Sequence, residues 1–265
     1  MYRHVSTIAL AVALGVFGLS AQAQDGASVT GGAAPLQAQP SPSASLAFPS
    51  VFGATSAVSA PNGTAFAALS YVTPRGGVKS SDDDGDLSLG YAFGNPVSGV
   101  SAQVAINVLG LDPFGDAGSV SLSLSRMLRA GGSSATFASV GAGNVLPWGV
   151  ARRGDTTYVA AVSHIQAYQL ANGVELPVQY TFGYGSASTL SDDGRGRAGP
   201  GAFFGVGMGL TQNLSGSISF TETQVNMGLS LSIPQLAGAG LSLGVYDVTD
   251  NTNRQQVALG LSLAF

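Results

Sequence analysis

The residues with the clearest catalytic potential are Ser163 and His164, which are neighbours in the sequence. Histidine is the most common general base in enzymes, and it can activate a serine hydroxyl for nucleophilic attack. Residues 156–169, however, have the pattern of a β-strand, in which adjacent side chains point to opposite faces. Ser163 and His164 therefore cannot act on each other. We predict no catalytic residue and no enzymatic activity, and we keep a barrel hydrolase that uses His164 as a second alternative function.

Two other motifs lack the context that their chemistry needs. The four aspartates of an acidic stretch resemble a calcium loop, but Tyr91 stands where an EF-hand needs its bidentate glutamate. The stretch GRGRAG has the glycine spacing of a dinucleotide site, yet it follows a polar loop and precedes a strand-like stretch. We predict neither a metal site nor a cofactor. The residues concerned are Asp82, Asp83, Asp84 and Asp86, and Gly194, Gly196 and Gly199.

The composition indicates that something other than water covers much of this chain. Of its 265 residues only 9% are charged and 45% are hydrophobic, whereas soluble proteins normally carry about 25% charged residues. The formal net charge of -4 and the absence of a basic cluster argue against a nucleic-acid partner. The chain has no cysteine, which excludes disulfides and thiolate metal sites.

The first residues have the features of a secretory signal peptide. Arg3 and His4 precede an apolar run over residues 8–19, and Ala21-Gln22-Ala23 forms a cleavage site. We therefore predict a signal peptide over residues 1–23. Residues 24–47 are rich in Ala, Gly, Pro, Gln and Ser and read as a disordered leader. Residues 48–62 are more apolar, and three readings stay open: a plug of the lumen, a periplasmic latch or more leader.

From residue 63 to residue 265, apolar residues alternate with small or polar ones in about twelve stretches, with a range of eight to fourteen. This period of two predicts antiparallel strands. Long connections alternate with short ones, and the charged residues gather in the long connections, as in a closed transmembrane β-barrel with both termini in the periplasm. A soluble two-sheet sandwich is the main rival fold. Arg126 and Arg129 break the apolar face of their strand, and snorkelling to the membrane interface explains them.

The last strand gives the family resemblance. Val257, Leu259, Leu261, Leu263 and Phe265 share one face, and the chain ends on this phenylalanine. The strand resembles the C-terminal strand of Gram-negative outer-membrane β-barrels, a porin-like superfamily. The resemblance implies that Leu261, Leu263 and Phe265 carry the signal read by the outer-membrane assembly machinery. It also implies a bilayer that contains lipopolysaccharide as the surroundings of the barrel.

The inner face of such a barrel determines its function. If the apolar faces meet lipid, the lumen is lined by Ser, Gly, Ala, Thr, Gln and Asn, and about twelve strands leave open space inside. The first hypothesis is a passive, porin-like channel for small solutes, either open or plugged by the N-terminal segment. A structural or adhesive surface barrel is the alternative. The polar groups predicted to line the lumen are Gln103, Asn107, His164, Glu175 and Gln179.

Overall fold

The structure is a computed structural model of the chain. It describes residues 49–60, 62–73, 84–109, 114–131, 133–190, 198–233, 236, 239–252 and 255–265. The predicted signal peptide and the predicted leader over residues 24–47 lie outside the described residues. No helix in the described part of the chain is long and apolar enough to span a membrane.

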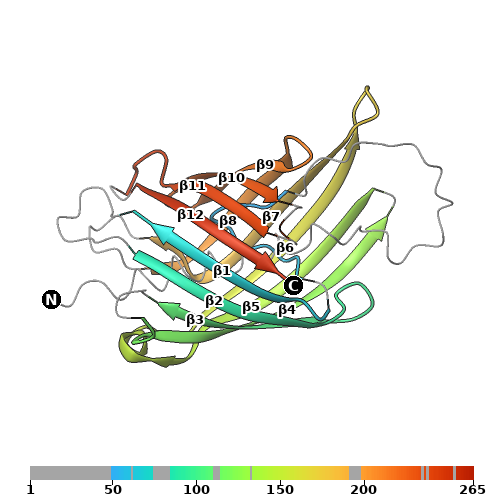
Figure 1. The fold of residues 1–265 in the computed structure, drawn as a ribbon. Coiled ribbons are helices and arrows are strands. Elements are labelled where there is room, and N and C mark those ends of the chain that lie inside the picture. Colours follow the sequence, from blue (N-terminus) through green and yellow to red (C-terminus); the bar gives the residue numbers. More distant parts are fainter. Residues whose placement is uncertain are drawn as a thin grey trace.

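Twelve antiparallel strands form a closed barrel (Figure 1). Each strand pairs with its neighbours in sequence, and β1 pairs with β12 to close the ring. The predicted closed antiparallel barrel of about twelve strands is thus confirmed. The strands are β1 (Ala65–Val72), β2 (Asp84–Gly94), β3 (Ser101–Leu109), β4 (Gly118–Gly131), β5 (Ser134–Trp148), β6 (Thr157–Gln169), β7 (Glu175–Leu190), β8 (Ala198–Gly209), β9 (Leu214–Thr221), β10 (Val225–Ile233), β11 (Ala239–Tyr246) and β12 (Gln256–Ala264).

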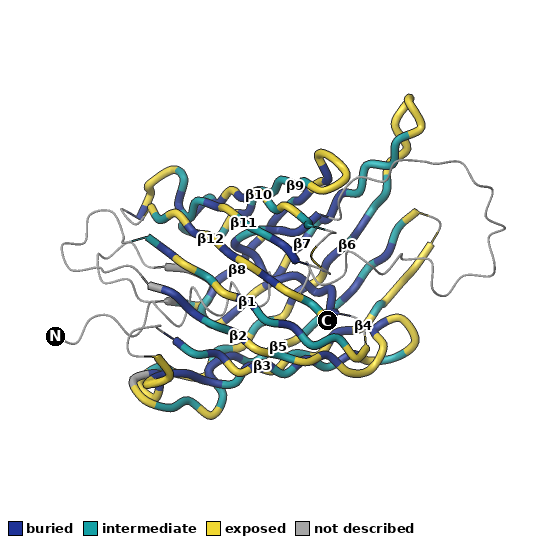
Figure 2. The backbone as a smooth tube through the Cα atoms, viewed as in Figure 1, coloured by how far each residue is buried: buried dark blue, intermediate teal, exposed yellow. Residues whose placement is uncertain are grey.

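The alternation of each strand separates an exposed apolar face from a buried one (Figure 2). On β12, Leu259, Leu261 and Leu263 are exposed, whereas Ala258 and Ser262 are buried. Backbone groups that meet lipid need internal partners, and a closed ring of strands supplies them. The exposed leucines and the closed ring are the features of a transmembrane β-barrel, and they overturn the sandwich, in which these leucines would meet each other in a dry core.

The seam between β1 and β12 involves the last residue of the chain. The backbone N–H of Phe265 donates to the Ala65 carbonyl, and the Ala65 N–H donates to the Phe265 carbonyl, both at 2.9 Å. Tyr71 opposes Leu259 further along the seam. The C-terminal strand therefore pairs along its whole length and closes the barrel.

The two ends of the barrel differ in their connections. At one end, here called the short-turn end, lie the start of β1, the end of β12 and the short connections after β2, β4, β6, β8 and β10. The opposite end is called the long-loop end. Two of the predicted long connections are shorter than expected, because β5 continues to Trp148 and β7 to Leu190. The pairing of β4 with β5 shifts in register near this end, where Asn144 and Leu146 have positive φ angles. The 3-10 helix η2 (Gly149–Arg153) comes directly after β5.

Candidate functional site

Residues 49–60 lie inside the barrel and are called the inner loop here (Figure 1). Ala54, Ala57 and Ala60 are completely buried, and Val51 and Val58 are at most 3% exposed. The polar partners of this loop are side chains on the buried faces of β4, β6, β7, β9 and β10. Of the three readings of residues 48–62, the described residues thus occupy the position of a plug.

The first arm of the inner loop runs from the short-turn end toward the middle of the lumen. The Ser50 Oγ lies 2.8 Å from the Ser230 Oγ on β10. Deeper inside, the Phe52 N–H donates to the Ser217 Oγ at 3.0 Å, and the Ser219 Oγ donates to the Phe52 carbonyl at 2.7 Å. The wall thus satisfies both backbone groups of Phe52.

The loop reverses direction at Gly53, which has a φ of +75° that favours glycine. On the return arm, the Gln179 Nε2 donates to the Ser56 Oγ at 3.0 Å, and the Ala57 N–H donates to the Ser163 Oγ at 2.9 Å. The Asn62 side chain accepts from the Gly94 N–H at the last residue of β2. Both arms of the inner loop therefore reach the same, short-turn end of the barrel.

Glycines on the inner wall make room for the loop. A Cβ atom on Gly228 or Gly244 would overlap the Phe52 side chain, and one on Gly205 would overlap Val51. The Phe52 ring packs against Tyr246 with its centroid 4.6 Å away. The missing side chains of these strands are therefore replaced by the side chains of the loop.

The other contact of the inner loop is apolar. Its small side chains join a buried cluster with Ala135 and Phe137 of β5, Ala161 and Ile165 of β6, and Phe203 of β8. Bringing these residues together buries apolar surface that the polar lumen would otherwise leave in contact with water. The inner face of β6 thus carries Ala161 and Ile165 beside the polar Ser163, and the inner loop covers these residues.

This arrangement corrects the predicted position of His164. The sequence analysis predicts that His164 lines the lumen, whereas the structure has Ala161 and Ile165 of the same strand inside. His164 lies on the outer face, where its Nδ1 is 2.9 Å from the Thr136 Oγ1. Ser163 lies on the opposite face and is completely buried against the inner loop. His164 is therefore not placed to act as a general base within the lumen.

The structure places three of the predicted lumen residues on the buried inner face: Gln103, Asn107 and Gln179. Asn107 connects β2 with β4, because it accepts from the Ser88 Oγ at 2.8 Å and donates to the Ser121 Oγ at 3.1 Å. Glu175 instead lies at the rim of the short-turn end, where it accepts from the Gln169 Nε2 at 2.6 Å. These residues do not form one cluster, since Gln179 bonds the inner loop and Asn107 bonds the wall.

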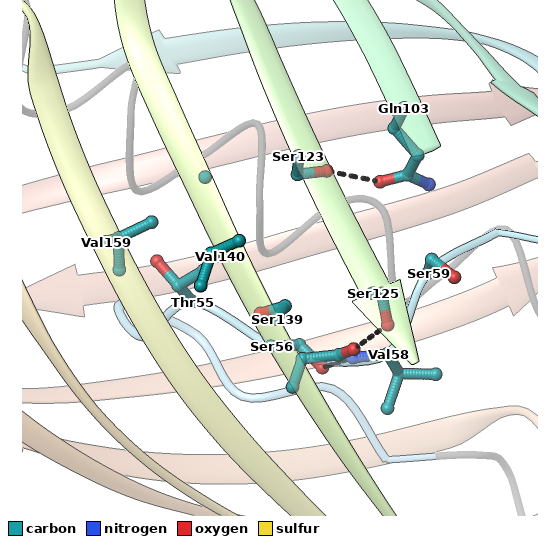
Figure 3. A pocket seen from close by; sticks show the side chains of 12 residues that line it. Thr55, Ser56, Val58, Ser59, Gln103, Ser123, Ser125, Ser139, Val140 and Val159 are labelled. Atoms are coloured by element: carbon teal, nitrogen blue, oxygen red, sulfur yellow. Dashed lines mark hydrogen bonds between the residues drawn. The ribbon is translucent and has the colours of Figure 1, made fainter. Parts of the chain in front are cut away.

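A pocket lies between the return arm of the loop and the wall formed by β3 to β6 (Figure 3). It measures about 280 Å³ when counted out to its open mouth, and its interior has room for about one water molecule. The Ser123 Oγ donates to Gln103 along one side at 3.4 Å, while the buried Gln103 Nε2 has no hydrogen-bond partner among the described residues. The lining comprises Thr55, Ser56, Ala57, Val58, Ser59, Gln103, Ser123, Ser125, Ser139, Val140, Gly141 and Val159.

A buried aspartate connects the tip of the loop with the long-loop end. The Asp247 carboxylate accepts from the backbone N–H of Asn251 and of Thr252, at 3.0 and 2.8 Å. The Asp247 N–H donates to the Asn226 Oδ1, and the Asn226 Nδ2 donates to the Ser219 Oγ that bonds Phe52. This chain of hydrogen bonds was not predicted from the sequence, in which Asp247 belongs to no recognised motif.

The inner loop contributes no charged side chain to its contact with the wall. The hydrogen bonds described above between the inner loop and the wall join hydroxyl, amide or backbone groups. Among the described residues, no group of three His, Cys, Asp or Glu side chains could hold a metal ion. The arrangement is therefore suited to contacts with uncharged polar groups.

No protein-family model matches the sequence, and no curated protein is significantly similar to it. Among solved structures, the outer-membrane protein Omp33 of Acinetobacter baumannii is similar, with a TM-score of 0.48 and 10% identity over 77% of this chain and 98% of that chain. The KdgM porin has a TM-score of 0.48 and 7% identity over 76% of this chain and 99% of its own. The NanC porin has a TM-score of 0.45 and 9% identity over 75% and 98%. Barrels that are alike at this level can have unrelated functions.

Proposed function

We propose that the protein is a passive outer-membrane channel for small uncharged polar solutes, in which the inner loop closes the lumen at rest. The observation that carries the proposal is the neutral, hydrogen-bonded contact between the loop and the wall. A hydrogen bond between neutral groups contributes about 0.5 to 1.5 kcal/mol, because water replaces each partner when the bond opens. The loop can thus leave the wall without the cost of exposing a buried ion pair.

The size of the ring supports the same function. Eight strands enclose a space that side chains fill, and the diameter of a barrel grows roughly linearly with strand number. The inner face of this barrel carries mainly serine, glycine and alanine on β2, β4 and β8, so withdrawal of the loop leaves a polar opening. Such an opening passes small polar molecules and offers few charges to attract ions of one sign.

The proposal includes an orientation. Short turns of bacterial barrels face the periplasm and long loops face the outside. The short-turn end, where β1 begins and β12 ends, therefore faces the periplasm of a Gram-negative cell, after export through the predicted signal peptide. The loop then enters the lumen from the periplasmic side.

A disulfide between the loop and the wall tests the channel directly. The Oγ atoms of Ser50 and Ser230 are 2.8 Å apart, close enough for two cysteine sulfurs at these positions to bond. The chain has no other cysteine. We expect oxidised Ser50→Cys/Ser230→Cys protein to show no conductance in a planar bilayer and no uptake of a small sugar in liposome swelling. Reduction should restore both, and each single variant should behave like the unmodified chain.

Deletion of residues 24–62 provides the second arm of this test. We expect the shortened barrel to conduct continuously, because the inner loop no longer occupies the lumen. A barrel that conducts in neither form would refute the channel. The deep burial of Val51, Ala54 and Ala57 would then support the alternative of a structural surface barrel with a permanent plug.

A further inference from the structure

The outer wall near the short-turn end carries two arginines on one face. Along β4 the odd-numbered residues up to Met127 face inward, and Arg126 faces outward. A bulge follows, because Met127 opposes Phe137 while Arg129 already opposes Thr136. The extra residue at the bulge reverses the alternation and turns Arg129 outward as well. Without it, Arg129 would point into the barrel.

The pairing of four strands extends this face into a polar row. Arg129 opposes Thr136, Thr136 opposes His164, and His164 opposes Tyr180 on β7. Neighbouring strands lie about 4.8 Å apart, so the row spans about 14 Å of the outer wall. The bond from His164 to Thr136 fixes the imidazole, and the Tyr180 hydroxyl lies 3.3 Å from that of Tyr168. Guanidinium, imidazole and phenol groups thus line one strip.

This strip lies where the apolar surface ends. In the row nearer the middle of the barrel, Arg126 stands beside outward-facing Ala138, Val162 and Phe182. In the row on the other side, Gly131, Ser134 and Gln166 follow on β4 to β6, before apolar Val178 on β7. The change from apolar to polar residues on the outer face of a membrane barrel marks the depth of the lipid headgroups.

Both arginines are exposed, and neither has a hydrogen bond or ion pair among the described residues. The described acidic residues lie in connections or strand ends at the long-loop end, apart from Glu175, which bonds Gln169. Two guanidinium groups at headgroup depth therefore face the membrane without a carboxylate partner. Arginine donates paired hydrogen bonds that match the oxygens of a phosphate group.

We propose that Arg126, Arg129, Thr136 and His164 form a binding site for the phosphate of an anionic phospholipid on the outer wall of the barrel. The arginines bind the phosphate oxygens, and the acyl chains lie along the apolar surface next to Val162 and Phe182. The site is independent of solute passage, because it lies on the face opposite to the lumen.

Lipid binding to the purified full-length chain in a nonionic detergent tests the site, with native mass spectrometry as the measurement. We expect the unmodified protein to bind phosphatidylglycerol more tightly than phosphatidylcholine. Each arginine near an anionic lipid surface contributes about a factor of five in affinity, so Arg126→Gln/Arg129→Gln should weaken phosphatidylglycerol binding about thirtyfold. Binding of phosphatidylcholine should change by less than about twofold, since the zwitterionic lipid gains little from the added positive charges.

A matched control removes the same charge at the other end of the barrel. Arg152→Gln/Arg153→Gln alters two arginines of η2 at the long-loop end and should leave phosphatidylglycerol affinity within about twofold, because these groups lie beyond the reach of screened charges. Equal loss in both double variants, or no lipid preference in the unmodified protein, would overturn the site.

Two further measurements separate the lipid from other occupants. Glycerol 3-phosphate in large excess should fail to displace the lipid, and displacement at equal concentrations would show a site for free phosphate instead. Loss of a dimer in Arg126→Gln/Arg129→Gln would show that a second copy of the chain covers the strip. The heat-dependent gel mobility of each variant tests whether its barrel is folded. The lipid preference of the unmodified chain tests the site even if a variant fails to fold.

Discussion

The inner wall of the barrel has two unlike sides. On β2 to β4, polar side chains bond one another, as in the series from Ser88 through Asn107 to Ser121. On β5 to β8, apolar side chains such as Ile165 and Phe203 pack against the inner loop. The first side bonds mainly within the wall, although the Ser125 hydroxyl donates to the Ala57 carbonyl of the inner loop, whereas the second side packs mainly against that loop. Whether an inward-facing residue of this barrel is polar or apolar therefore depends on whether it contacts other wall residues or the inner loop.

The largest effect is expected at Phe203 on the apolar side, which is 2% exposed and lies over Gly183. Phe203→Ala should lower the free energy of unfolding by about 3 to 5 kcal/mol, because it leaves a cavity between the wall and the loop. Urea unfolding in lipid vesicles measures this loss. A cysteine placed at Ala54 should also react faster with a thiol reagent in this variant. Unchanged labelling would show that the apolar side does not hold the loop.

The next effect is expected at the tip of the loop. Gly228→Val would overlap Phe52 and should destabilise the seated loop by about 1 to 3 kcal/mol, through overpacking. The fraction of time spent conducting in a planar bilayer should rise at least about fivefold. Gly131→Val is the matched control, since a Cβ at Gly131 has no neighbour within 4 Å. An equal rise in the conducting fraction in both variants would contradict the idea that the position of Phe52 depends on the space at Gly228.

The self-bonded side should respond differently. Asn107→Ala removes the link between Ser88 and Ser121 and should cost about 1 to 2 kcal/mol of stability. The cysteine at Ala54 should keep its slow labelling, because Asn107 does not bond the inner loop. Faster labelling in Asn107→Ala would mean that the two sides of the wall are coupled, and the contrast between them would then fail.

The smallest effect is expected at His164. Its side chain lies on the outer face, so His164→Phe should change the stability by less than about 0.5 kcal/mol and leave the conductance unchanged. Urea unfolding and bilayer recordings on the same sample measure both quantities. A clear change in conductance would put the imidazole back in the lumen, where the sequence had placed it.

The sequence predicts the barrel well because most strands have large apolar residues on one face only. On β12 the choice of face is unambiguous, since Leu259 and Leu261 alternate with Gly260 and Ser262. On β6 it is ambiguous, because Val162 outside and Ile165 inside are both apolar. An apolar residue predicts burial against something, and sequence alone does not say whether that partner is lipid or another part of the chain.

The candidate site was harder to predict than the barrel. Residues 49–60 are small and weakly apolar, with no period that indicates a strand or a helix. A signal was nevertheless present in the strands around them, where Gly205, Gly228 and Gly244 interrupt the inner face at the positions that Val51 and Phe52 fill. Several glycines facing one volume indicate that another segment occupies it.

The entry of both loop arms through one opening has a consequence for assembly. Residues 49–60 enter and leave the lumen at the short-turn end, so this described segment is not threaded through the ring. Strands β1 and β12 can pair around a water-filled lumen, and the inner loop can enter that lumen afterwards. Closure of the barrel and insertion of the inner loop are then two separate steps of folding.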